Sequence, residues 1–249
     1  MNKFSQQRGF TLVEIAIVLV IIGLLLGGIL QGQELIRSAQ VRNLADQNSN
    51  VQAAYYGFID RYRLIPGDLA GGNGANQACS ILGTPRLPNC ATVGGNANGQ
   101  LDAGSFPEAS ALWAHLQAAG FLQGTYDGSA TNAATYTAPT PAQAPTNPWG
   151  GHLLMGQSPD YLDTLVTPAN RLHLITGVTV PVGIMRELDL KIDDSLPATG
   201  VLRASGATTA TYGAVGASAT TPTCVDTGVT PNIWNITGEQ VDCNGYYLF

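Results

Sequence analysis

The chain is poor in charged side chains, and above all in lysine. Charged residues make up 11% of its 249 positions, against roughly 25% in ordinary globular domains. Lysine occurs at only two of these positions, and the formal net charge is −6. This balance argues against nucleic acid as a partner, because binding to phosphate backbones depends on clustered basic residues. Low charge together with 45% hydrophobic residues also excludes a largely disordered chain.

The motifs of common enzymes and metal proteins are missing as well. The three histidines are scattered, and no G-x-S-x-G, H-E-x-x-H or P-loop pattern occurs. No C-x-x-C pair or nearby histidine offers the ligand spacing of a zinc site. We therefore expect no enzymatic activity, no catalytic residue and no cofactor, with calcium as the one alternative left open.

What the sequence does contain is a long apolar run near its N-terminus. From residue 10 to residue 30 it is 21 residues long and carries one charge, Glu14. About 20 helical residues cross the hydrocarbon core of a membrane. Lys3 and Arg8 precede the run, and positive residues favour the cytoplasmic side. The run therefore predicts a single membrane span with a cytoplasmic N-terminus.

A cleaved signal peptide and a plain one-span anchor are the simpler interpretations of this run. No Ala-x-Ala-like cleavage site follows it, which disfavours the signal peptide. A carboxylate such as Glu14 costs about 2.5–3.5 kcal/mol at mid-bilayer on insertion scales, so an acid within a span indicates a function. Glu14 is therefore the first candidate functional residue.

Residues Arg8 to Glu14, with the sequence RGFTLVE directly before the apolar helix, resemble the prepilin processing motif of type IV pilins and type II secretion pseudopilins. The resemblance implies that a membrane prepilin peptidase cuts between Gly9 and Phe10. It also implies N-methylation of the new Phe10 amine and a role for Glu14 in filament assembly.

The same resemblance implies the partners and the location of the chain. Its partners would be the prepilin peptidase and other pilin subunits, contacted through the N-terminal helix. The chain would be a single-pass protein of the inner membrane before assembly. It would then enter an extracellular or periplasmic filament.

The resemblance and the pattern of residues together predict three parts. The resemblance implies that residues 1–9 are a leader peptide, and the pattern predicts one long helix over residues 10–64 that ends before Pro66-Gly67. Within this helix, residues 10–30 are expected to be the transmembrane segment and, as the resemblance implies, the filament core. Residues 31–64 have the three- and four-residue apolar spacing of an amphipathic helix. Residues 65–249 form an extracytoplasmic globular domain.

The pattern of residues in the globular part predicts an α+β fold. Ser105 and Glu108 have the spacing of a capping box at the start of a second helix, and a further helix is expected over residues 182–192. Strands are expected over residues 152–155, 172–178, 201–204 and at the C-terminal end, whereas residues 124–150 form an extended excursion and residues 205–223 form a loop or weak edge strands. A long N-terminal helix packed on a small antiparallel sheet with extended loops resembles the pilin architecture.

Four cysteines in an extracytoplasmic chain predict two disulfides. Their positions are Cys79, Cys90, Cys224 and Cys243. Three connectivities are possible, and proximity in the sequence favours Cys79–Cys90 with Cys224–Cys243. The second of these bonds would clamp the C-terminal region.

Two groups of oxygen-bearing side chains are candidate calcium ligands. Asn96, Asn98 and Asp102 alternate around a glycine, as at the start of an EF-hand loop, although Asn-Gly is also a common turn signal. The second group, close to the end of the helix expected over residues 182–192, consists of Asp189, Asp193 and Asp194. A solvated acidic patch is the alternative for the second group.

Together these features predict a structural subunit of a type IV pilus-like filament. Cleavage after Gly9 would leave 240 residues, a length that favours a minor or specialised pilin. A type II secretion pseudopilin is the first alternative. A membrane-anchored extracytoplasmic binding or adhesion module is the second.

Overall fold

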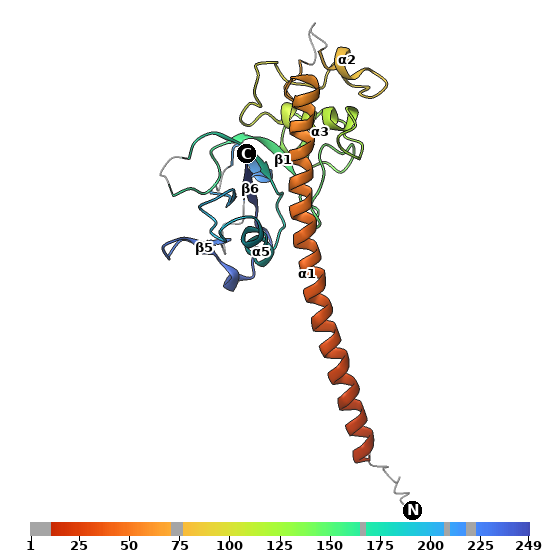
Figure 1. The fold of residues 1–249 in the computed structure, drawn as a ribbon, viewed down its shortest axis with the longest axis vertical. Coiled ribbons are helices and arrows are strands. Elements are labelled where there is room, and N and C mark those ends of the chain that lie inside the picture. The colour runs from red at the N-terminus through yellow and green to blue at the C-terminus, as the bar shows by residue number, and fades with distance from the viewer. Residues whose placement is uncertain (1–10, 71–76, 165–167, 207–209, 218–222) are drawn as a thin grey trace, which may run out of the picture. The chain divides into compact units, whose positions relative to one another are not determined.

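The computed structural model describes residues 11–70, 77–164, 168–206, 210–217 and 223–249. The chain divides into two compact units, residues 1–40 and 41–249, and each is described by itself. Helix α1, Leu12–Tyr62, contributes residues to both units (Figure 1). Its observed ends lie two residues inside the predicted range of 10–64 at each side.

Helix α1 ends at Tyr62, directly before a residue in the left-handed conformation. Arg63 adopts a φ of +57°, and its N–H donates to the carbonyl of Ile59 at 2.8 Å. A left-handed residue after the last turn is a common helix terminator. Pro66 follows shortly afterwards and cannot continue the helix.

The larger core of the second unit joins α1 to the residues that follow it. Val51, Ala54, Tyr55 and Phe58 line one face of α1 and are buried. They belong to one apolar cluster with α3, Phe106–Ala118, and with the first strands of the sheet. The spacing of these α1 residues is that of an amphipathic helix, as the sequence predicts for residues 31–64.

A four-stranded antiparallel sheet forms the β part of the second unit. Its strand order is β1-β2-β6-β3. The strands are β1 (Leu154–Ser158), β2 (Arg171–Ile175), β3 (Leu202–Ala204) and β6 (Gly245–Leu248). The C-terminal strand β6 therefore lies inside the sheet, which explains why this end of the chain is apolar. The predicted α+β class, with a long helix and a small antiparallel sheet, is confirmed.

A second, smaller core surrounds helix α5, Val182–Ile192, whose bounds are those expected from the sequence. It contains Ile184, Met185 and Leu188 of α5 together with Trp234. Trp234 belongs to a short hairpin of β4 (Val225–Asp226) and β5 (Ile233–Trp234). The bond between Cys224 and Cys243 lies in the same core.

Several short elements were not expected from the sequence. They are α2 (Gln77–Leu82), α4 (Ala133–Tyr136), η1 (Gly213–Val215), η2 (Ile236–Gly238) and the hairpin β4–β5. The expectation of an extended segment over residues 124–150 is wrong at α4. There Asn132 and Thr135 form a capping box, and Tyr136 is fully buried. Strand β1 also begins at Leu154 and not at His152.

Candidate functional site

Glu14 lies in the first turn of α1 and closes a capping box with Thr11. The amide N–H and the hydroxyl of Thr11 both donate to Oε2 of Glu14, each at 2.8 Å. In return, the N–H of Glu14 donates to Oγ1 of Thr11 at 3.3 Å. Such reciprocal bonds satisfy backbone donors that a helix start leaves open. A carboxylate is also favoured at this end of the helix dipole.

Thr11 is a site residue that the sequence analysis did not single out. The signal was present, because Thr11 and Glu14 have the T-x-x-E spacing of a capping box. Thr11 holds the carboxylate of Glu14 against the first turn of the helix. The acid is thus positioned by its own chain and remains exposed.

Gly9 and Phe10, the predicted processing residues, lie outside the described residues. The description begins at Thr11, immediately after them. Processing at Gly9 and methylation at Phe10 therefore stay predictions.

Directly after Glu14, α1 presents apolar side chains on all its faces. From Leu12 to Leu30 every residue is exposed, and Leu12 itself is 91% exposed. Among the described residues, α1 is the one helix long and apolar enough to cross a membrane. An apolar surface of this extent requires lipid or other protein to cover it.

Two disulfides lie in the second unit. Cys79 is bonded to Cys90, and Cys224 to Cys243, with S–S distances of 2.01 and 2.11 Å. Each bond joins the cysteines that are nearest in the sequence, which is the favoured one of the three connectivities. The second bond ties the start of β4 to the residues just before β6.

The loop of Asn96, Asn98 and Asp102 is organised by hydrogen bonds of its own. The side-chain amides of Asn96 and Asn98 donate to the two oxygens of Asp102, at 2.7 and 2.8 Å. Their amide oxygens accept the N–H groups of Asn98 and Gln100. The amide N–H₂ groups, and not the amide oxygens, thus face the carboxylate. Calcium in this loop stays a prediction.

Glu108 connects this loop to α3. Ser105 is the N-cap, as expected, and its Oγ accepts from the N–H of Glu108 at 3.4 Å. The carboxylate of Glu108 does not return to Ser105. It accepts from the N–H of Asp102 at 2.5 Å. Burial raises the pKa of Glu108 to about 7.

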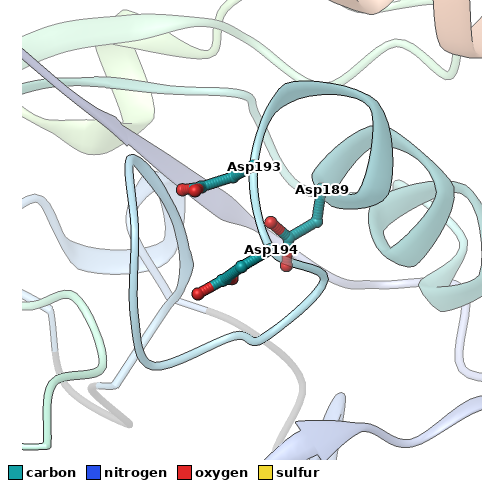
Figure 2. Close-up of side chains that lie close together, drawn as sticks. All are labelled: Asp189, Asp193 and Asp194. Carbon is teal, nitrogen blue, oxygen red and sulfur yellow. The ribbon is translucent and has the colours of Figure 1, made fainter.

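The structure brings the predicted group of Asp189, Asp193 and Asp194 together. One carboxylate oxygen of each lies within 4.8 Å of the others, and Figure 2 shows the three side chains extending to the same side of the α5 end. Oδ2 of Asp189 accepts from Nε1 of Trp234 at 2.7 Å. Burial raises the pKa of Asp189 to about 6. This partner, 45 residues away, could not be found from the sequence.

The histidines His115 and His173 are fully buried. Burial lowers the pKa of each to about 4, so both are neutral at pH 7. Nδ1 of His115 accepts from the N–H of Gly67 at 2.9 Å. His115 therefore fixes the turn after α1 to α3, which is a structural role.

Comparison with known proteins bears on the N-terminal segment. Residues 4–30 match the family model described as the prokaryotic N-terminal methylation motif. No curated protein and no solved structure shows a significant match to the chain. The match includes Gly9, Phe10 and Glu14 as well as the apolar part of α1. The chain therefore carries, at its N-terminus, the prepilin-type signature of type IV pilins and pseudopilins.

Proposed function

We propose that this chain is a structural subunit, of the minor or specialised kind, of a type IV pilus-like filament. The observation that supports this most directly is the methylation motif over residues 4–30 continuing into an exposed apolar helix. Because the motif is the prepilin-type signature of pilins and pseudopilins, it supports the processing and assembly of this segment. The exposed helix supplies the surface that neighbouring subunits would cover.

The inner membrane is the proposed location before assembly. The chain crosses it once, with Lys3 and Arg8 on the cytoplasmic side. A prepilin peptidase removes residues 1–9 there, and the globular part from residue 65 onward lies outside the cytoplasm. Cleavage removes both of these basic residues and creates a positive α-amino group at Phe10.

Glu14 then acts as a check on subunit register. A carboxylate in an apolar filament core is costly alone and tolerated when paired. The new Phe10 amine, of the same or of an incoming subunit, is the natural cationic partner. A subunit placed out of register would leave Glu14 unpaired and would dissociate.

Mass spectrometry of the mature protein tests the processing step. We expect an N-methylated Phe10 terminus in protein recovered from sheared filaments. Protein that keeps residues 1–9 in its membrane-bound and filament fractions would refute the proposal. A Gly9→Val variant is the matched control, because it blocks close approach of a protease to the backbone and leaves α1 unchanged.

The pseudopilin of a type II secretion system is the second candidate, because the matched signature is common to both classes. Electron microscopy of the cell surface, with and without the gene, separates them. Loss of surface filaments that contain this subunit supports the pilus. Unchanged surface filaments with a loss of protein secretion support the pseudopilin.

A further inference from the structure

We propose that Asp189, Asp193 and Asp194 bind a calcium ion. Asp189 comes from the last turn of α5, and the other two follow directly after the helix. One oxygen of each carboxylate lies within 4.8 Å of the others (Figure 2). Calcium binds oxygen ligands at about 2.3–2.6 Å. Two oxygens on opposite sides of one ion are therefore separated by about twice that length, which agrees with the 4.8 Å within which the carboxylate oxygens lie.

Asp189 provides a second, independent observation in favour of a bound cation. Its side chain is 0% exposed, and Oδ2 is bonded to the indole of Trp234. Its other oxygen, Oδ1, is buried and accepts no hydrogen bond of good geometry within the described part of the chain, although the backbone N–H of Ser195 lies near the carboxylate and favours its charged form. A buried carboxylate oxygen without a partner is costly. A cation bound between the three carboxylates removes that cost.

The local charges also favour a cation. Three carboxylates gather at the C-terminal end of α5, where the helix dipole is itself negative. Lys191, the basic residue in the last turn of α5, forms an ion pair with Glu187 at 3.1 Å. It is therefore engaged one turn back along the helix. Because Lys191 is paired with Glu187, it does not neutralise the three aspartates. A bound cation compensates for the repulsion among their carboxylates.

The loop after α5 holds two of the carboxylates in position. Asp194 accepts from the N–H of Leu196 at 2.9 Å and also from the hydroxyl of Thr199. Asp193 accepts from the N–H of Val201. A carboxylate oxygen has more than one lone pair, so these bonds orient the ligands without using up their capacity for a metal ion.

Calcium fits this arrangement better than magnesium. Asp189 is buried, Asp193 is half-buried and Asp194 is exposed, so the group is open on one side. Calcium accepts six to eight oxygens in flexible geometry, and water can complete its shell on the open side. Magnesium requires a near-octahedral shell with shorter bonds and is usually held by only one or two carboxylates, whereas three carboxylates lie together here.

Isothermal titration calorimetry of the full chain in detergent micelles tests the proposal. The protein is first stripped with EDTA and then titrated with calcium chloride. We expect one saturable site with a Kd of about 10⁻⁴–10⁻³ M, the range of extracellular calcium modules. No saturable binding up to about 10 mM calcium would overturn the proposal.

Variants locate the ion. Asn keeps an acceptor oxygen and removes the charge, so Asp193→Asn/Asp194→Asn is expected to fold and to bind calcium at least tenfold more weakly. The control Asp46→Asn/Asp242→Asn removes two exposed charges elsewhere in the second unit and is expected to bind normally. Equal affinity of the wild type and the Asp193/Asp194 variant would refute the site, since it would place the ion elsewhere, for example at Asp102.

Terbium luminescence gives a second readout that depends on position. Terbium replaces calcium at oxygen sites and is excited through a nearby indole, here that of Trp234 bonded to Asp189. We expect indole-sensitised terbium emission, and we expect added calcium to reduce this emission because it displaces terbium from the site. Asp194→Asn, which changes the exposed member of the group, is expected to reduce the emission. Emission unaffected by this change and by calcium would count against the proposal.

Discussion

The indole Nε1 of Trp234 donates a hydrogen bond to Oδ2 of Asp189, with 2.7 Å between the two atoms. This bond joins the β4–β5 hairpin to the last turn of α5. Both side chains are buried, with exposed fractions of 2% and 0%. The stability of the smaller core therefore depends on a polar contact as well as on apolar packing.

Removing this contact should destabilise the protein. Trp234→Phe deletes the N–H and leaves Oδ2 of Asp189 without its donor, and hydrogen bonds to charged groups contribute about 1.5–3 kcal/mol. Trp113→Phe is the matched control. Trp113 is also buried, but its indole donates to a neutral group, the hydroxyl of Tyr136 at 2.8 Å, and such bonds contribute about 0.5–1.5 kcal/mol.

Urea unfolding followed by circular dichroism compares the two variants. We expect the free energy of unfolding to fall by about 1 kcal/mol more in Trp234→Phe than in Trp113→Phe. An equal loss in the two variants would show that the bond to Asp189 contributes no more than a neutral one.

Substitution of Glu14 should separate assembly from membrane insertion. Glu14→Gln removes the charge that we propose pairs with an amine in the filament, while the helix remains apolar and long enough to span the membrane. We expect normal membrane levels and a more than tenfold loss of the subunit from sheared filaments, because breaking a buried ion pair costs about 3–5 kcal/mol.

Glu34→Gln is the control for this experiment. Glu34 is an exposed acid on the same helix α1, outside the apolar run of residues 10–30. Its loss should leave the amount of subunit in filaments unchanged. Normal assembly of Glu14→Gln would contradict the role of the acid.

Stability should depend on pH through His115. Its pKa is about 4 in the folded chain because of burial, against about 6.5 in an unfolded chain. Between these values the unfolded state binds more protons, so the free energy of unfolding falls as the pH falls from about 6.5 to 4. His173, buried in the same way, adds to this loss.

The variant His115→Asn isolates the contribution of His115. Asparagine keeps an acceptor for the N–H of Gly67 and does not titrate. We expect His115→Asn to be less stable than the wild type at pH 7, with a Tm difference that narrows as the pH falls towards 4. Parallel Tm profiles of the two proteins across this range would rule out the proposed linkage.

The two disulfides should differ in their effect on stability. The chain-entropy model assigns about 3 kcal/mol to closing loops of either size, with sequence separations of 11 and 19 residues. Cys224 and Cys243 are in addition both buried in the smaller core, whereas Cys79 is only half-buried. We expect Cys224→Ala/Cys243→Ala to lower the urea midpoint more than Cys79→Ala/Cys90→Ala. A larger fall of the urea midpoint in Cys79→Ala/Cys90→Ala would show that burial of the Cys224–Cys243 bond does not add to its contribution to stability.

Much of the fold could be predicted because its signals are local. Helix α5 has the predicted bounds, since Ile184, Leu188 and Ile192 recur with the regular spacing of one helix face. Helix α1 differs from its predicted range by two residues at each end. The predicted strands are less accurate, and the hairpin β4–β5 was not predicted at all. Two-residue strands carry too few side chains for a period to be recognised.

Asn147 illustrates why other contacts could not be predicted. Its buried side chain donates to the carbonyl of Thr176 at 3.0 Å, and its Oδ1 accepts from the N–H groups of Trp149 and Gly151. The bonds within residues 147–151 are typical of an Asx turn. The bond to Thr176 spans 29 residues, and no local pattern indicates it.

The N-terminal signature, the apolar run of residues 10–30 and Glu14 as the one charge in that run could be read from the sequence, because each is a property of neighbouring residues. Which groups meet across the chain could be seen only after the chain was folded. The tertiary structure paired Trp234 with Asp189 and brought three carboxylates within 4.8 Å of one another. Among the described residues, it left Oδ1 of Asp189 without a hydrogen bond of good geometry. The physical reason is that burial and contact between distant segments depend on packing, which local periodicity does not encode.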